Sequence, residues 1–218
     1  MSFSVRLGSE LMAVDAGSST PLSVEITSHG QESDTFEITI EGLDPDWVTL
    51  PAEPTVVEAG GKQTEVVVLR AHRVAESVAG AYTFSVRVRS LSTGETRSAQ
   101  ALLDIQPFHQ ISLDVEPRKQ ALGGGAATSQ FVLKILNLSN VEHELQLFGS
   151  EPDSKVSFQF EFDKVVVGPG QEREVLVDVR PNKRSYIAAP RLFGLSMSFR
   201  SVRYPTVTGY VQAQLEQR

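Results

Sequence analysis

The residues best suited to metal or acid–base chemistry are few and widely spaced along the chain. The four histidines are His29, His72, His109 and His143, and at least 34 residues separate any two of them. Zinc ligands usually lie a few residues apart on one element, so this set would form a zinc site only through a tertiary coincidence. Cysteine is absent, which removes disulfides, thiolate ligands and cysteine nucleophiles. We therefore expect no metal and no cofactor.

The carboxylates show no catalytic or calcium-binding spacing. Four of them gather in the first half of the chain, namely Asp34, Glu41, Asp44 and Asp46. No acidic loop with an interior glycine contains them, so we interpret them as solvated turns. Glu172 and Glu174 alternate along one segment, which is typical of the outer face of a strand rather than of an acid–base pair. No nucleophile elbow, phosphate loop or dinucleotide fingerprint occurs, so we expect no catalytic residue and no enzyme.

Basic residues gather around one aromatic late in the chain: Arg180, Lys183, Arg184, Tyr186 and Arg191. Basic side chains interleaved with aromatics are typical of single-stranded nucleic-acid binding. This group has a single aromatic, and the net charge of −7 disfavours a grip on nucleic acid or anionic lipid. We therefore interpret it as a solvated loop or as a binding patch for an acidic protein partner.

Trp47 and Asn137 each allow a functional and a structural interpretation. Trp47 would suit sugar stacking, but an indole has so much apolar area that we expect it to plug the end of a sandwich. Asn137-Leu-Ser139 fits a glycosylation sequon, and we interpret Asn137 as a turn residue.

Apolar and polar residues alternate with period two along much of the chain, which predicts strands. The pattern is cleanest where Tyr82, Phe84, Val86 and Val88 alternate with Thr, Ser and Arg. No stretch carries a convincing apolar stripe of helical period. Many short strands with turn signals between them predict an all-β fold of antiparallel sandwiches.

The chain repeats itself once, at a shift of about half its length. At a shift of 109, Val24, Ile26, Phe36 and Ile38 match Leu133, Ile135, Leu145 and Leu147, and Gly61 and Glu65-Val66 match Gly170 and Glu174-Val175. At a shift of 111, residues 82–90 match residues 193–201. We predict two tandem immunoglobulin-like β-sandwiches of about seven strands each, residues 1–107 and residues 108–218, joined by a short semi-rigid linker at Pro107.

The motif order of the first half resembles the bacterial Ig-like modules of the NEW3 or NPCBM-associated type, as in α-galactosidase NEW3-like domains. Asp34-Thr-Phe36 is followed by Gly42-Leu-Asp-Pro-Asp-Trp47, then Ala59-Gly-Gly61 and Ala79-Gly-Ala-Tyr82-Thr-Phe84. The family usually has Pro-Gly where this chain has Ala59-Gly60. The second half resembles the more divergent partner domain of such arrays. The resemblance implies an accessory module used as a spacer or for adhesion or protein interaction, sometimes beside glycosidases, and no catalysis.

The two halves carry different charge. Residues 1–108 hold 15 acidic and 7 basic residues, whereas residues 109–218 hold 12 and 13. The acidic first half would attract the basic 180–191 region of another copy, an attraction that salt screens. No secretion signal or membrane span is recognisable, so we expect a soluble chain, either cytoplasmic or cut from an anchored protein, of unknown compartment.

These observations favour a non-catalytic structural or protein-binding module, meaning a spacer, scaffold or assembly component. We expect its partner to be a protein or a second copy, without nucleic acid and without direct membrane insertion. The alternative is a carbohydrate-binding accessory or adhesion module of a cell-surface protein, with a glycan as the partner. A line of exposed aromatics would favour that alternative, and the sequence offers few, since aromatics are 7% of the residues.

Overall fold

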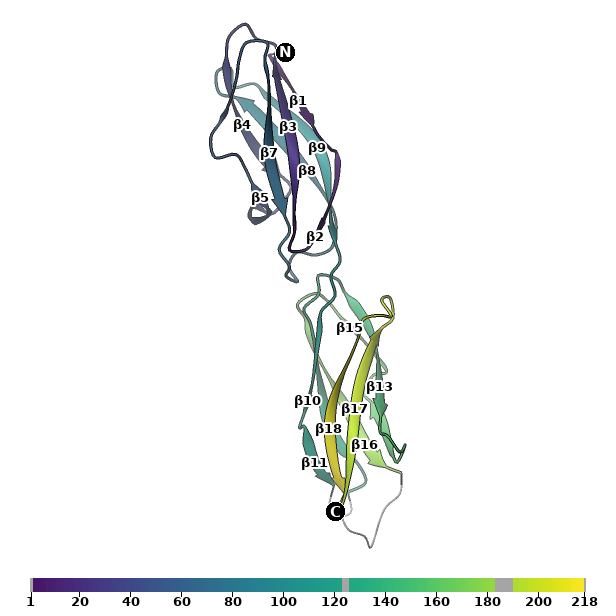
Figure 1. Cartoon of the computed structure of the whole chain (residues 1–218). Coiled ribbons are helices and arrows are strands. Elements are labelled where there is room, and N and C mark those ends of the chain that lie inside the picture. The colour runs from purple at the N-terminus through teal and green to yellow at the C-terminus, as the bar shows by residue number, and fades with distance from the viewer. Residues whose placement is uncertain (1, 123–125, 183–189, 218) are drawn as a thin grey trace. The chain divides into compact units, whose positions relative to one another are not determined.

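The alternating segments of the sequence form strands throughout the computed structural model (Figure 1). The structure describes residues 2–122, 126–182 and 190–217. It divides into two compact units, Met1–Phe108 and His109–Arg218. Within the described ranges the one helical element is the short 3₁₀ turn η1 (Pro45–Trp47). No helix there has the length and apolar character needed to cross a membrane.

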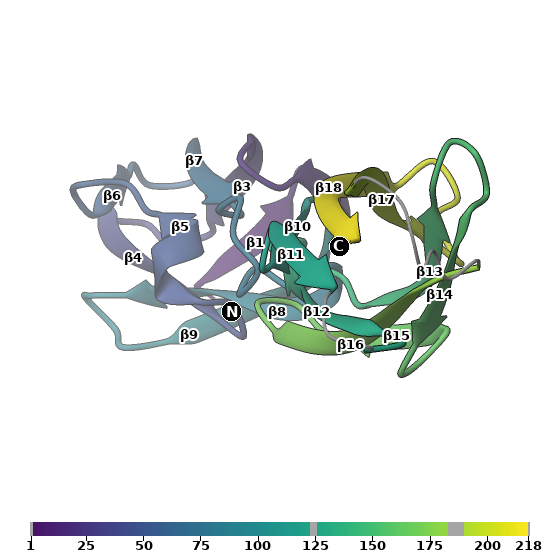
Figure 2. The same cartoon turned by 90° about the horizontal axis from the view of Figure 1, so that it is seen from below.

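The first unit packs a four-stranded sheet against a five-stranded sheet, and Figure 2 shows β3 and β7 facing β8 and β9 across its core. Its strands are β1 (Phe3–Leu7), β2 (Leu11–Asp15), β3 (Ser19–Ser28), β4 (Asp34–Glu41), β5 (Val48–Thr49), β6 (Thr55–Val57), β7 (Lys62–Arg70), β8 (Gly80–Ser90) and β9 (Thr96–Gln106). The sheet orders are β1-β3-β7-β5 and β2-β9-β8-β4-β6. The neighbours β3 and β7 in one sheet, and β9, β8 and β4 in the other, have the central order of an immunoglobulin sandwich.

The second unit repeats this topology strand for strand. Its strands are β10 (Ile111–Glu116), β11 (Lys119–Leu122), β12 (Ser129–Asn137), β13 (His143–Ser150), β14 (Val156–Phe160), β15 (Lys164–Val167), β16 (Glu172–Pro181), β17 (Arg191–Ser201) and β18 (Thr208–Gln217). The sheet orders are β10-β12-β16-β14 and β11-β18-β17-β13-β15.

The predicted fold class, two tandem immunoglobulin-like β-sandwiches, is confirmed, with two differences in detail. The described part of each unit has nine strands instead of about seven, because two segments of the chain each contribute a strand to both sheets. These strands are β1 and β2, and β5 and β6, in the first unit, and β10 and β11, and β14 and β15, in the second. Pairing is antiparallel except between β2 and β9 and between β11 and β18, which are parallel.

Each unit has its own hydrophobic core between its two sheets. In the first unit, Phe3 on β1 meets Phe36 on β4 with ring centroids 4.8 Å apart. Trp47 is 7% exposed and contacts Tyr82 edge-on at 5.2 Å, so it closes the rim of the core as expected and is not a sugar platform. The second core is built around fully buried residues such as Phe131 and Leu145.

The glycine turn before β7 and β16 corrects the proposed alignment of the two copies. Gly60 and Gly170 both adopt the left-handed backbone conformation, with φ of 62° and 69°, so Gly60 and not Gly61 corresponds to Gly170. The same slip of one residue extends into the following strand, where Val66 is 50% exposed and Val175 is fully buried. Because a strand alternates its faces, a slip of one residue turns every side chain to the opposite side.

Candidate functional site

Two of the four histidines meet in the second unit. His109 precedes β10 and His143 opens β13, and Nδ1 of His109 lies 3.2 Å from Nε2 of His143. Tyr204, in the turn between β17 and β18, packs against both rings, with centroids 4.2 Å from that of His109 and 5.5 Å from that of His143. The wide spacing of the histidines in sequence therefore does not hold in space for this pair.

His143 also binds a buried serine at the end of β17. Its Nδ1 lies 2.9 Å from Oγ of Ser201, and both residues are fully buried. Oγ of Ser201 accepts a further hydrogen bond from the backbone N–H of Tyr204 at 3.3 Å. Burial lowers the pKa of His143, and the neighbouring His109 lowers it further, while burial also lowers the pKa of His109. Both rings are therefore favoured in their neutral form, in which each has one donor and one acceptor.

A serine at hydrogen-bond distance from histidine is the geometry of an activated nucleophile. Here the burial of both partners hides the hydroxyl of Ser201 from any substrate in this conformation. The first unit has the same arrangement with different chemistry, because Ser90 donates to Oδ2 of Asp34 at 2.5 Å. Asp34 and His143 are the first residues of the equivalent strands β4 and β13. We therefore interpret both hydrogen bonds as structural contacts that stabilise the fold.

The turn after β12 secures the segment that carries His109. Ser139 Oγ accepts a hydrogen bond from the backbone N–H of Gln110 at 2.8 Å. Asn137 is fully buried, and its Nδ2 donates to the carbonyl oxygens of Val141 and Val167, each at 2.8 Å. Both donor hydrogens of the Asn137 amide are thus used by the backbone, which fits the interpretation as a turn residue and leaves no access for a glycan.

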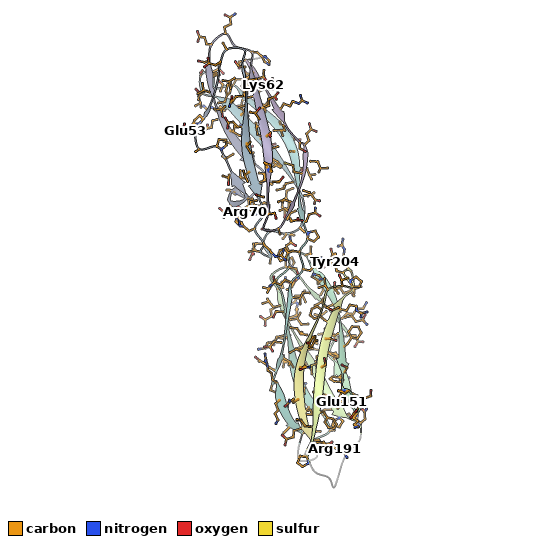
Figure 3. All side chains as sticks on the ribbon, viewed as in Figure 1. Glu53, Lys62, Arg70, Glu151, Arg191 and Tyr204 are labelled. Carbon is orange, nitrogen blue, oxygen red and sulfur yellow. The ribbon has the colours of Figure 1, made fainter. Side chains whose placement is uncertain are left out.

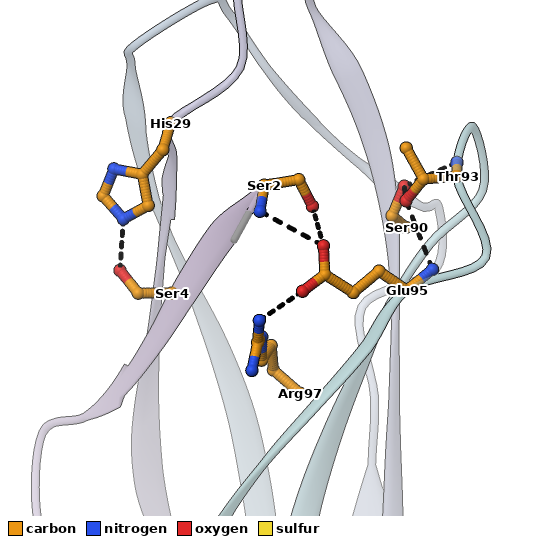
Figure 4. A network of polar contacts seen from close by, with 7 residues as sticks. All are labelled: Ser2, Ser4, His29, Ser90, Thr93, Glu95 and Arg97. Carbon is orange, nitrogen blue, oxygen red and sulfur yellow. Dashed lines mark hydrogen bonds and ion pairs between the residues drawn. The ribbon is translucent and has the colours of Figure 1, made fainter.

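A second polar network lies in the first unit, where β1 begins beside β9 (Figure 4). Glu95 accepts hydrogen bonds from the side chain of Ser2 and from its backbone N–H, the latter at 3.1 Å, and pairs with Arg97. The two hydrogen bonds from Ser2 lower the pKa of Glu95. His29 contacts Ser4 through Nε2 at 3.1 Å. The hydrogen bonds between Ser2 and Glu95 attach the start of the chain to the neighbouring sheet, whereas the contact of His29 with Ser4 joins the end of β3 to β1 within one sheet.

The acidic residues of the first unit make local contacts of their own. Asp44 Oδ1 accepts a hydrogen bond from the backbone N–H of Asp46 at 3.0 Å and so begins η1. Glu41 pairs with Arg87 on the neighbouring strand. Among residues 2–122, 126–182 and 190–217, no three His, Cys, Asp or Glu side chains group in a way that would hold a metal ion.

The structure places only part of the basic group predicted to bind a partner. Arg180 is exposed near the end of β16, and Arg191 is exposed at the start of β17. Arg191 lines a hollow of about 470 Å³ together with Lys155 and Asn182, at the end of the unit opposite Tyr204 (Figure 3). The other three members, Lys183, Arg184 and Tyr186, lie outside the described residues.

No family model matches the chain. No curated protein matches it either. Among solved structures, the chain is similar to a protein of unknown function from Porphyromonas gingivalis W83, with 11% identity and a TM-score of 0.34 over 98% of this chain and 99% of that one. It is also similar to the D00–D0 domain of intimin (9% identity, TM-score 0.42, 98% of each chain) and to the YadV chaperone (9%, 0.34, 97% and 99%). The strand orders of the two units define the immunoglobulin-like fold.

The internal repeat is the signal that could have indicated the contact between His143 and Ser201, although not the approach of His109 and Tyr204. A shift of 109 places His143 on Asp34, and a shift of 111 places Ser201 on Ser90. A polar residue that opens one strand and a serine that ends its neighbour are thus kept together in both copies.

Proposed function

We propose that the chain is a non-catalytic structural or protein-binding module, namely a spacer, scaffold or assembly component built of two Ig-like domains. The observation that carries the proposal is that the two units share one fold but differ in charge. The strand order repeats between the units, and so does the buried hydrogen bond between a strand-end serine and the first residue of the neighbouring strand. The charge does not repeat, since the first half is strongly acidic and the second nearly neutral. Two units with the same fold and different surfaces fit a role in which each surface binds a different partner.

The finer assignment of the first domain to the NEW3 or NPCBM-associated type is also a proposal. The backbone supports this assignment, because two glycines of the matching motifs have φ values at which any other residue would be strained. Gly42 has φ of 100°, and a Cβ on it would lie 2.8 Å from the carbonyl oxygen of Thr83. Gly80, in the Ala-Gly-x-Tyr motif, has φ of 144°. Both values lie where residues with a Cβ rarely go.

We propose that the partner is the acidic first half of another copy or an acidic protein. The binding surface would be the basic group of Arg180, Lys183, Arg184, Tyr186 and Arg191. The exposure of Arg180 and Arg191 at one end of the second unit supports this. Surface charges of this kind act over the screening length, which falls from about 30 Å at 0.01 M salt to about 3 Å at 1 M.

Sedimentation velocity across that salt range tests self-association. We expect a concentration-dependent increase in sedimentation coefficient at low salt, which is lost at high salt and in the double variant Arg180→Glu/Arg191→Glu. The matched control is Arg173→Glu/Arg203→Glu, which changes the net charge equally at other exposed positions and should keep most of the association. A strict monomer at low salt would contradict self-association. Hydrolysis of a soluble substrate panel that is lost when one carboxylate is changed would contradict the non-catalytic assignment.

Carbohydrate binding is the second candidate function. The specific observation in its favour is a pair of exposed aromatic side chains, Phe148 and Tyr210, on one sheet of the second unit.

A further inference from the structure

The outer face of the five-stranded sheet in the second unit carries a row of three cross-strand partners. Phe148 on β13 is opposite Ser198 on β17, and Ser198 is opposite Tyr210 on β18. Residues opposite each other on neighbouring strands share a face, so the two rings lie on one surface with a hydroxyl between them. Phe148 is 41% exposed and Tyr210 is 71% exposed. We call Phe148, Ser198 and Tyr210 the aromatic row.

The first unit shows that the scaffold does not need these rings. Its equivalent row, on β4, β8 and β9, consists of Thr39, Arg87 and Ser98. Arg87 forms an ion pair with Glu41 on the same outer face. The same topology therefore folds with a polar row at this place, and the two aromatics of the second unit are an addition to its surface.

The positions around the row carry fewer charged residues than the equivalent positions of the first unit. The rows on either side of it in the second unit are Gln146, Arg200 and Thr208, and Ser150, Ser196 and Gln212. Arg200 is the one charged residue among these nine positions. The nine equivalent positions of the first unit include four charged residues: Glu37, Glu41, Arg87 and Arg89. The face of the second unit thus combines two rings with amide and hydroxyl groups.

The face is hollowed on both sides of the row. Phe148, Arg200, Thr208 and Tyr210 help to line one hollow of about 610 Å³. Further along the same three strands, a hollow of about 590 Å³ is lined in part by Ser150, Ser196, Gln212 and Gln214, and also by the charged residues Arg118, Lys119 and Glu151. Side-chain amides both donate and accept hydrogen bonds, whereas the guanidinium of Arg200 only donates.

We propose that this face binds an extended, uncharged oligosaccharide, with pyranose rings stacked on Phe148 and Tyr210. A pyranose has an apolar face that stacks on an aromatic ring and a rim of hydroxyls that exchange hydrogen bonds with amides and hydroxyls. The strands that carry the two rings are separated by β17 and run about 10 Å apart, which suits an extended chain of sugars rather than one small molecule. The inference rests on the second candidate function, carbohydrate binding by a non-catalytic module.

The other classes of partner fit the face less well. The core of a protein–protein interface is a contiguous, well-packed patch from which charge is depleted, whereas here a polar side chain interrupts the apolar surface. A nucleic acid requires a groove with many basic groups to neutralise its phosphates, and the nine positions offer one arginine.

Affinity electrophoresis of the full chain in native gels containing soluble polysaccharides tests the proposal. The probes are a mixed-linkage β-glucan, arabinoxylan, galactomannan and hydroxyethyl cellulose, each against a gel without polysaccharide. We expect at least one of them to retard the chain. Tyr210→Ala and Phe148→Ala should each weaken this retardation at least tenfold, while Tyr210→Phe keeps it because the ring remains.

The matched control is Phe162→Ala, which removes a ring that is 53% exposed outside the row and should leave the retardation unchanged. Thermal unfolding of each variant separates a lost ligand contact from a lost fold. Absence of retardation by all four polysaccharides, or equal loss in Phe162→Ala, would overturn the proposal. Release of reducing ends in the same incubations would instead contradict the non-catalytic function and leave the role of the row standing.

Discussion

A buried serine at the end of one central strand is tied to the first residue of its neighbour in both units, but the partner differs. Ser90 binds a carboxylate and Ser201 binds an imidazole. Burial alone would raise the pKa of Asp34, but hydrogen bonds from Ser90 and Ser92 outweigh it and hold this pKa below its ordinary value. Burial lowers the pKa of His143. The equivalent contacts of the two units therefore respond to pH in two different ranges.

We expect the second unit to lose stability as the pH falls below about 6.5, where histidines of the unfolded chain take up protons. Because the pKa of His109 and His143 is lowered in the folded state, the unfolded state binds more protons across this window. Their contribution is complete above it and declines as the pH falls. The contribution of Asp34 to the first unit persists to about pH 4 and is lost as the pH falls through its lowered pKa.

Urea unfolding from pH 8 to pH 5, with amide hydrogen exchange to resolve the two units, measures this dependence. His143→Phe should destabilise the second unit by about 1–3 kcal/mol at pH 8, because the buried hydroxyl of Ser201 loses its imidazole partner and keeps only the hydrogen bond from the backbone N–H of Tyr204. It should also flatten the pH profile of that unit, whereas the exposed His29→Gln should not. An unchanged profile in His143→Phe would mean that the pair does not control the response.

At the scale of the elements, β13 and β14 approach each other at a glycine. A Cβ on Gly149 would lie 2.2 Å from the ring of Phe158, so the ring occupies the space of the missing side chain. We expect Gly149→Ala to destabilise the second unit by about 1–3 kcal/mol through overpacking. Gly194→Ala on β17, where a Cβ meets nothing within 4 Å, should be neutral or stabilising. Chemical denaturation of both variants decides this, and equal effects would refute the close approach.

Much of the sandwich was predictable because every strand of the core is buried on one face. Val24 and Ile26 alternate with polar neighbours, and both are fully buried as the pattern predicts. The strand register of β7 and β16 was not predictable to the residue. Val66 and Val175 are the same residue type on opposite faces, and it takes their burial in the structure, together with the left-handed Gly60 and Gly170, to reveal the slip.

The polar sites were less predictable than the core because they depend on contacts between distant strands. His109 and His143 are 34 residues apart, and they come within hydrogen-bond distance because β10, which follows His109, and β13, which His143 begins, belong to the two sheets that pack face to face. Phe148 and Tyr210 are ordinary strand residues in sequence. Their exposure follows from the side of the sheet they face, which composition does not show.

For the whole molecule, the two separate cores predict that each unit folds without the other. The first core uses residues up to Ile105 and the second begins at Val115. We expect fragments 1–108 and 109–218 each to unfold cooperatively, with a free energy of about 5–15 kcal/mol, the usual range for a domain. Circular dichroism during urea titration measures it. A fragment that unfolds without a sigmoidal transition would show that its core depends on the other half.

The parallel pairs β2–β9 and β11–β18 have a mechanical consequence. In each unit a strand near the beginning lies beside the last strand and runs in the same direction, so the chain enters at one end of this ladder and leaves at the other. Tension between the two ends of a unit therefore loads all hydrogen bonds of the ladder in shear at once, whereas tension on a hairpin opens its bonds one after another. A linker built of such units would transmit a pulling force while staying folded.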